Sequence, residues 1–451
     1  MEAQLDISLL FSVLAGIVVL LILILKCKIQ SFIALLIASI VVGMLAGMSP
    51  SSILMTIQEG MGNTLGFVAL VIGLGAIFGS ILEYSGGAET LAQFMLLKFG
   101  EKRASWALML TGFLVAIPVF FDVAFIILVP ILYSLQRKTK KSLLLYAIPL
   151  LAGLAITHSF IPPTPGPIAV ADILTADLGW VILFGVLVGI PTATVCGPIF
   201  ANYISKKIHV EAPKITANET MESYPAVSLI LAIIGIPIGL IVCNTVINSP
   251  LVSDNLIEEN IKQWIRFIGN PIVALILANL IAWYVLGVRR KVSREKLLDI
   301  TSRSMGPTGV IILLTGAGGV FKQVLVNTSI GEMLANYFSQ IGVSILVFGF
   351  FISAIIRILQ GSATVAMITA AGITAPLVMV QENFTEIDKA LLVIIIASGA
   401  SILSHVNDSG FWLVSKYLGI NEKQTFQSWT LMTTILAFMS FVIVLGISLI
   451  I

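Results

Sequence analysis

Charged residues are scarce in this chain of 451 residues, in which Asp, Glu, Lys and Arg together make up 11%. Soluble domains carry roughly 25% charged residues, whereas here hydrophobic residues reach 58% and the mean hydropathy is +1.06. Because roughly 20 apolar residues span a bilayer, the chain has room for many spans and for no sizeable soluble domain. The scarcity of charge therefore predicts a polytopic membrane protein.

Cysteine and histidine are also scarce, with three residues of each. Cys27, Cys196 and Cys243 stand far apart, so their spacing indicates neither a disulfide framework nor a metal-binding cluster. We find no nucleophile or metal cluster that an enzyme would need, and we expect no cofactor. The net charge of +2 and the lack of a long basic run argue against a nucleic-acid partner.

Apolar runs of spanning length recur along the chain. Two further apolar stretches, 104–136 and 341–376, are interrupted by polar residues, Pro or Gly, which suits either re-entrant hairpins or paired spans. The pattern predicts an all-α protein with about 10 spans plus two hairpins. The ten runs are 7–25, 30–47, 64–84, 142–158, 178–204, 225–247, 264–288, 304–325, 390–405 and 427–450.

Basic residues predict the orientation, because Lys and Arg favour the cytoplasmic ends of spans. They fall in groups near residues 26–28, 98–103, 137–141, 206–207 and 289–296, and the loops between these groups, such as the one expected around Glu59, are acidic or neutral. Ten crossings with both termini outside place every basic group in the cytoplasm. This requires that 104–136 starts and ends in the cytoplasm and that 341–376 starts and ends outside. Tryptophans near the starts of apolar runs are expected to be interfacial anchors: Trp106, Trp180, Trp264 and Trp429.

An internal repeat gives these segments an order. The segment 73–94 aligns with 316–337 at a constant offset, and His158 corresponds to His405 farther along. The loops around the first interrupted stretch are basic and those around the second are acidic, which predicts two repeats of inverted topology. We accordingly divide the chain into N-terminal spanning helices (1–63), a first transport repeat (64–207), a connecting loop with two spans (208–303) and a second, inverted transport repeat (304–451).

Interruptions in apolar runs point to a site, because non-helical backbone inside a bilayer needs internal hydrogen-bond partners or a water-lined cavity. Each half has two such breaks, at 117–123 and 156–167 in the first and at 357–366 and 403–412 in the second. We expect the four breaks to meet around one site.

The prolines at 162–167 form the clearest break, since they remove backbone donors and forbid a continuous helix. A half-helix starting near Gly166 would point its positive dipole end at the opening, which suits a carboxylate. Pro163, Thr164 and Gly166 are therefore candidate substrate ligands. The alternative is a periplasmic loop between two ordinary helices.

Two aspartates lie in breaks that otherwise carry little charge. Asp122 follows two phenylalanines, and Asp408 stands between Asn407 and Ser409, which add further donors and acceptors. Because an intramembrane carboxylate is costly unless it is paired or functional, either aspartate is a candidate proton carrier, and Asn407 and Ser409 are candidate substrate ligands. The alternative for each aspartate is a structural hydrogen bond to a neighbouring helix.

His158 and His405 precede the two repeat-equivalent breaks. Histidine exchanges protons near neutral pH and donates to carboxylates, so we expect His158 to bind substrate and His405 to take part in proton coupling. The alternative is that each histidine caps a helix end or satisfies a neighbouring group.

The small residues Gly361, Ser362 and Thr364 stand where the second hairpin should turn, and close backbone approach there would suit sugar hydroxyls or an ion. Packing between helices is the alternative. Arg357 is the preferred cationic partner for a substrate carboxylate, and Lys322 is the second choice. Either cation can instead sit at a helix end or pair with a buried aspartate.

At these breaks the sequence resembles the gluconate permease (GntP) family of the ion transporter superfamily over nearly the whole chain. The resemblance implies proton-coupled import of gluconate or a related sugar acid, hairpin tips that meet broken helices at one site, a homodimer and a bacterial inner membrane location. Thr164 departs from the histidine that several members carry. The motifs are GNTLG (62–66), PVFFDVAFII (118–127), THSFIPPTPGPIA (157–169), GAGGVFKQVL (316–325), GSATVA (361–366) and SHVNDSGFW (404–412).

Proton coupling also has an energetic reason. Bringing a monoanion into a negative-inside cell costs ~2.3 kcal/mol per 100 mV, and a proton taken with it makes the step electrically neutral. The expected function is therefore sugar-acid import by proton symport with alternating access. A sodium-coupled carboxylate transporter and a passive anion channel remain the alternatives.

Overall fold

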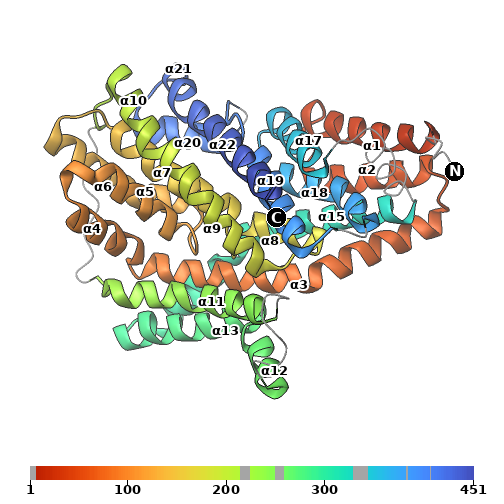
Figure 1. Cartoon of the computed structure of the whole chain (residues 1–451), viewed down its shortest axis with the longest axis horizontal. Coiled ribbons are helices and arrows are strands. Elements are labelled where there is room, and N and C mark those ends of the chain that lie inside the picture. Colours follow the sequence, from red (N-terminus) through yellow and green to blue (C-terminus); the bar gives the residue numbers. More distant parts are fainter. Residues whose placement is uncertain are drawn as a thin grey trace.

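The computed structural model describes residues 7–213, 224–248, 258–328, 344–381, 384–406 and 408–450, and every regular element in these ranges is a helix (Figure 1). Eight helical stretches in this part of the chain are long and apolar enough to cross a bilayer, and shorter apolar helices accompany them. Each of the ten predicted apolar runs coincides with one or more helices of the structure, although the helix at 390–405 is not one of these apolar stretches. The all-α polytopic fold predicted from the sequence is confirmed.

The helices up to residue 207 are α1 (Ile7–Leu25), α2 (Ser31–Leu45), α3 (Pro50–Tyr84), α4 (Gly87–Phe99), α5 (Ala104–Val115), α6 (Phe121–Thr139), α7 (Leu144–Phe160), α8 (Pro165–Leu174), α9 (Leu178–Thr194) and α10 (Phe200–Lys207). The later helices are α11 (Val227–Ile247), α12 (Glu259–Ile268), α13 (Pro271–Ala282), α14 (Arg294–Arg303), α15 (Met305–Asn327), α17 (Ile345–Gln360), α18 (Ala363–Val380), α19 (Glu386–Ala400), α20 (Ser409–Leu418), α21 (Glu422–Thr425) and α22 (Leu431–Ser448). Short π-helical turns connect α9 to α10 and α21 to α22.

The helix α3 is longer than the apolar run that predicted it. It begins at Pro50 instead of residue 64, because the Ser49 hydroxyl accepts a hydrogen bond from the Ser52 amide at 3.2 Å and a proline occupies the first helical position. Glu59, which we expected in a loop, therefore lies in the helix. The expected domain boundary at residue 64 also falls inside α3, whereas residues 207 and 303 are helix ends.

The predicted span 264–288 is divided into two helices. The span proper begins at Pro271, where the Asn270 side chain accepts from the Ile272 amide at 3.0 Å. The preceding α12 is a separate amphipathic helix that lies across the ends of α11 and α13 and points away from the rest of the molecule (Figure 1). Trp264 on α12 is 61% exposed.

The first interrupted stretch is a hairpin of α5 and α6. With 12 residues, α5 is about 18 Å long and too short to cross a hydrocarbon core of about 30 Å. An ion pair between Glu101, just before α5, and Lys138, near the end of α6, joins the two ends of the stretch. The stretch therefore starts and ends on one side, as a re-entrant hairpin does.

The second interrupted stretch is a hairpin of α17 and α18, which pack against each other. Its turn is at Gly361, whose φ of +84° is open to glycine and strained for other residues. Ser362 then caps α18 by accepting a hydrogen bond from the Val365 amide at 3.4 Å. The predicted turn position is confirmed.

Both halves repeat the same order of parts. A hairpin is followed by a helix (α7 or α19), by a break (161–164 or 401–408) and by a short helix (α8 or α20). The contacts are reciprocal, since α18 packs against α8 and α6 packs against α20. A two-fold relation between the halves would produce this pattern, while their inverted topology stays a prediction. The part of the repeat alignment at 329–337 lies outside the described residues.

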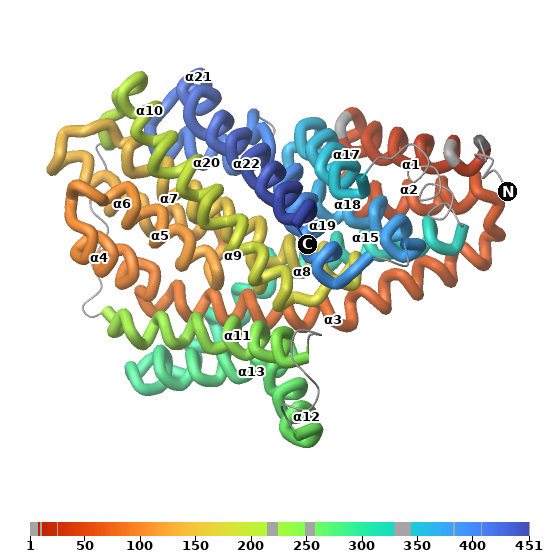
Figure 2. The backbone as a smooth tube through the Cα atoms, viewed as in Figure 1, coloured from red at the N-terminus to blue at the C-terminus, as the bar shows by residue number. Residues whose placement is uncertain are grey.

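The helices α3 and α15, which carry the first part of each aligned segment, pack against each other along an extended contact. A methyl group at Gly60 would lie 2.8 Å from the Val320 Cα, so the two backbones approach closely. Figure 2 shows α3 running along the molecule between the α11–α13 pair and the bundle that contains α5, α7 and α9. This long helix supports the breaks of the first half.

Candidate functional site

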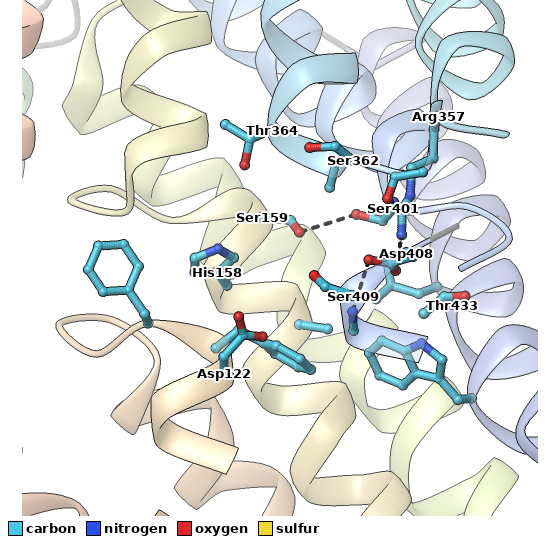
Figure 3. A pocket seen from close by; sticks show the side chains of 18 of the residues that line it. Asp122, His158, Ser159, Arg357, Ser362, Thr364, Ser401, Asp408, Ser409 and Thr433 are labelled. Atoms are coloured by element: carbon cyan, nitrogen blue, oxygen red, sulfur yellow. Dashed lines mark hydrogen bonds and ion pairs between the residues drawn. The ribbon is translucent and has the colours of Figure 1, made fainter. Parts of the chain in front are cut away.

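A cavity of about 620 Å³ is lined by residues from all four breaks, and the second break contributes His158 and Ser159 but not its prolines. Its wall comes from the start of α6, the end of α7, the first turns of α15, the α17–α18 turn, the residues around the break before α20, and the π-helical turn and first turns of α22. Figure 3 shows the labelled side chains of this wall. The wall is apolar in part and includes the following polar side chains: Asp122, His158, Ser159, Arg357, Gln360, Ser362, Thr364, Ser401, Asp408, Ser409, Trp429 and Thr433.

Arg357 and Asp408 form a buried ion pair in this wall. The Arg357 Nη2 lies 2.5 Å from the Asp408 Oδ2, and the two side chains are 5% and 13% exposed. The other terminal nitrogen, Nη1, donates to the Gly361 carbonyl at the hairpin turn, while Nε is buried without a partner among the described residues. The structure therefore contains the alternative arrangement, in which Arg357 pairs with a buried aspartate.

Asp408 is held by its own break and, through Ser404, by the last helix. It caps α20 by accepting from the Gly410 amide at 3.0 Å, and it also accepts from the Ser404 hydroxyl. Ser404 in turn accepts from the Trp429 indole N–H at 2.6 Å, and its amide donates to Thr433 at 3.2 Å. These bonds fix the carboxylate toward Arg357.

Asp122 faces the same cavity from the first hairpin. It lies in the first turn of α6, near the positive end of the helix dipole, and makes no hydrogen bond or ion pair within the part of the chain that the structure describes. Figure 3 shows Asp122 beside His158 on one side of the cavity and Asp408 beside Arg357 on the other. The cavity thus holds two carboxylates and one arginine among its described lining residues.

The repeat-related histidines have different surroundings. His158 lines the cavity from the last turn of α7, with its ring edge-on to Phe120 at 6.3 Å and its Nδ1 buried without a partner among the described residues. His405 lies outside the cavity wall, where its Nε2 is 2.9 Å from the Ile358 carbonyl. The two histidines therefore correspond in the sequence repeat but not in their surroundings.

The prolines of the second break lie outside the cavity wall, and their neighbourhood packs against α3, the tip of the first hairpin and α18. Pro163 and Thr164 border a small gap between α3 and the first hairpin tip, and the Pro163 carbonyl is 3.1 Å from where a methyl group at Gly75 would lie. Gly166 faces Met367 of α18, whose Cε would be 2.4 Å from an added Cβ. The helix α8 begins at Pro165, close to the expected position, but the predicted ligand roles of Pro163, Thr164 and Gly166 stay predictions.

Two further candidates lie elsewhere. Asn407 is outside the described residues. Lys322, the second-choice cation, does not line the cavity and interacts electrostatically with Asp172 of α8. Asp122, His158, Arg357, Gly361, Ser362, Thr364, Asp408 and Ser409 are the predicted residues that the structure brings together in the cavity wall.

Sequence reasoning missed several hydroxyls and misread one tryptophan. Ser401 at the end of α19 donates to Ser159 of α7 at 3.2 Å and so joins the two halves beside the cavity. Trp429, expected to be an interfacial anchor, is 4% exposed and bonded to Ser404, so this prediction is wrong. The polar residues of 428–434 interrupt a predicted apolar run, and this interruption was the sequence signal that could have placed this segment in the cavity wall.

The sequence matches the family described as GntP family permease over residues 8–450. It is 37% identical over 450 residues to a gluconate permease of Pseudomonas aeruginosa, with 99% of this chain and 98% of the relative covered. It is also 37% identical over 433 residues to a low-affinity gluconate transporter of Escherichia coli K12 (95% and 96% covered) and over 439 residues to its Gnt-II system L-idonate transporter (96% and 98% covered).

A solved structure with a similar fold is that of the YdaH transporter of Alcanivorax borkumensis, described as having an unusual topology. The TM-score is 0.64, with 96% of this chain and 97% of that chain covered, and the sequence identity of 13% limits the likeness to the fold. Helices long and apolar enough to cross a membrane, a polar cavity between the two halves of the chain and a family match along almost the whole length agree with one another. The chain belongs to the GntP permease family and is a multi-pass membrane transporter rather than an enzyme.

Proposed function

We propose that this chain imports gluconate or a related sugar acid together with protons, by alternating access to the cavity. The observation that carries the proposal is the position of Arg357, the one cation among the described lining residues, in a wall that is otherwise rich in hydroxyls. The relatives named for gluconate and L-idonate support the substrate class.

The cavity chemistry suits a short polyhydroxy acid. A guanidinium binds a carboxylate with two parallel hydrogen bonds, and the hydroxyls of Ser362, Thr364 and Ser409 offer partners for sugar hydroxyls on the same wall. The cavity volume of about 620 Å³ also lies within the range of roughly 300–1,000 Å³ that small-molecule sites occupy.

Proton coupling has two candidate carriers in the wall, Asp122 and Asp408. Both carboxylates line one cavity, so a substrate anion bound beside them adds negative charge that uptake of a proton by one of them would offset. His405, the third group predicted for coupling, lies outside the wall and its role stays a prediction. We expect replacement of the carrier by asparagine to abolish accumulation.

The way in which the cavity is bounded supports alternating access. Its wall combines a hairpin and the end of a helix from the first half with a hairpin and a break from the second. Movement of one repeat against the other would change which side of the membrane the cavity faces. A homodimer in the bacterial plasma membrane, with both termini outside, completes the proposal.

Uptake into proteoliposomes distinguishes this proposal from its alternatives. An inwardly directed pH gradient should drive accumulation of labelled gluconate, and a protonophore should abolish that accumulation. Accumulation driven by a sodium gradient alone would indicate the sodium-coupled alternative. Uptake that only equilibrates, with no response to either gradient, would indicate a passive channel, and the absence of uptake of any sugar acid would contradict the substrate class.

A further inference from the structure

We infer that Arg357 changes partner during transport, leaving Asp408 for the substrate carboxylate, and that Asp408 takes the transported proton when it loses Arg357. This inference rests on the proposed function and adds to it the physical link between the two transported species. It also chooses between the two cavity aspartates, Asp122 and Asp408.

The first step is the occupation of Arg357. Its two terminal nitrogens already hold the Gly361 carbonyl and the Asp408 carboxylate, and Asp408 is the described acidic partner of this guanidinium. A substrate carboxylate that binds Arg357 bidentately must therefore displace Asp408 or share the cation with it. Since Arg357 lines the cavity, the substrate can reach it without passing through packed side chains.

The second step is charge. The pair is 5% and 13% exposed, so water screens it poorly. With a substrate anion present, two carboxylates compete for one guanidinium, and an unpaired buried carboxylate is strongly unfavourable. A proton that enters the cavity from the bulk solution removes the excess charge by forming an O–H bond on Asp408, while one N–H···O contact of Arg357 is replaced by contacts to the substrate.

The third step is the environment of the protonated carboxyl. Ser404 now donates to the Asp408 Oδ2, and Trp429 donates to the Ser404 oxygen. A serine hydroxyl both donates and accepts, so Ser404 is able to receive the new O–H of Asp408 by rotation of its own proton. The Gly410 amide continues to hold Oδ1. The break therefore accommodates both protonation states of Asp408.

Other titratable groups face the pair from the surrounding elements. Asp122 on α6 and His158 on α7 share the cavity, and His405 belongs to the same break as Asp408. None of these three makes a described contact with Arg357, so none competes directly with the substrate for it. When the substrate binds Arg357, only Asp408 loses the positive charge that had neutralised its carboxylate.

The consequence is reciprocal coupling. Because the proton and the substrate both favour the state in which Arg357 has left Asp408, each strengthens the binding of the other by the same factor. A proton without substrate leaves Arg357 without an anion, and substrate without a proton leaves Asp408 without a cation. Both partly loaded states are therefore disfavoured, as symport requires.

The test compares Asp408→Asn with the wild-type transporter in proteoliposomes. Asparagine imitates the protonated carboxyl, so we expect this variant to keep gluconate–gluconate exchange and to lose accumulation driven by a pH gradient. Glu386→Gln, which removes an exposed carboxylate at the start of α19, is the matched control and should behave like the wild type. Arg357→Gln should lose both exchange and accumulation.

A second measurement uses the unmodified protein. Calorimetric titration with gluconate in buffers of different ionisation enthalpy should show uptake of about one proton per gluconate bound by the wild type, and none by Asp408→Asn. This readout keeps the inference testable if the variant fails to insert or fold. A wild-type titration without proton uptake would overturn the inference.

The outcomes separate the inference from the proposed function. If the wild type accumulates gluconate with protons and Asp408→Asn does so as well, the function stands and the partner exchange is wrong. The same holds if Asp122→Asn shows the uncoupled behaviour and Asp408→Asn does not. If the wild type does not accumulate any sugar acid, the proposed function fails and the inference falls with it.

Discussion

The Pro118 carbonyl oxygen lies 1.9 Å from the position that a β-carbon at Gly79 would occupy. The tip of the first hairpin therefore packs directly on the backbone of α3. Four residues earlier on the same helix, Gly75 faces the Pro163 carbonyl in a similar way. One helix thus positions both breaks of the first half, and the hairpin that carries Asp122 depends on a glycine outside the cavity.

We expect Gly79→Ala to displace the hairpin tip, because backbone atoms cannot move aside as a flexible side chain can. Overpacking of this kind typically costs about 1–3 kcal/mol. Thermal unfolding in detergent should show a lowered midpoint, and gluconate uptake should fall. Gly62→Ala on the same helix is the control, since nothing lies within 4 Å of its added methyl group. Equal effects of the two substitutions would contradict the assigned contact.

The two hairpins should open to opposite sides of the membrane. In a background without accessible native cysteines, Lys102→Cys and Lys140→Cys at the ends of the first hairpin should react only with reagents applied from the cytoplasm. Ser344→Cys and Gln381→Cys at the ends of the second should react only from outside. The labelling pattern of right-side-out and inverted vesicles measures this. Reaction of the two ends of one hairpin from opposite sides would exclude a re-entrant segment.

Trp264 on α12 should lie at the membrane interface. Its side chain is 61% exposed on a helix that lies across the ends of two spans, and amphipathic helices with exposed aromatic residues bury them near the headgroups. The fluorescence of Trp264 is obtained as the difference between the wild type and Trp264→Phe. Lipids brominated close to the headgroup should quench this difference. The same difference measured with Trp429→Phe gives the fluorescence of the buried Trp429, which these lipids should quench only weakly. Equal quenching of the two would be inconsistent with this placement.

Thr364 should contribute to recognition of sugar hydroxyls. Thr364→Val keeps the shape of the side chain and removes a hydroxyl from the cavity wall, so the gluconate affinity should fall by about 0.5–1.5 kcal/mol, the net value of one hydrogen bond. The control is Thr374→Val on the same helix, where the hydroxyl bonds to the Ala370 carbonyl away from the cavity. Concentration dependence of uptake measures both. An unchanged affinity in Thr364→Val would remove this residue from the binding site.

Local chemistry made several features predictable from the sequence. Prolines that cannot continue a helix marked the start of α8, and a glycine beside two hydroxyl residues marked the turn of the second hairpin. The unusual placement of Asp122 and Asp408 in apolar surroundings identified both cavity carboxylates. Each of these features depends on a residue and its immediate neighbours in the chain.

Features that depend on which helix faces meet were not predictable in this way. The bond between Trp429 and Ser404 joins residues 25 positions apart, and the proline break packs on α3 instead of opening into the cavity. The start of α3 was missed because its first turns carry polar residues such as Gln58 and Glu59, which interrupt the apolar run without interrupting the helix. Tertiary contacts decided these features, and a single sequence does not record them.

Proton movement caused by the substrate itself is the most direct test of the central claim. Gluconate added to de-energised proteoliposomes in weakly buffered medium should raise the external pH as protons enter with it, and a protonophore should remove the signal. Glu386→Gln should give the wild-type response, whereas Asp408→Asn should give none. Entry of labelled gluconate without any change in external pH would contradict proton symport.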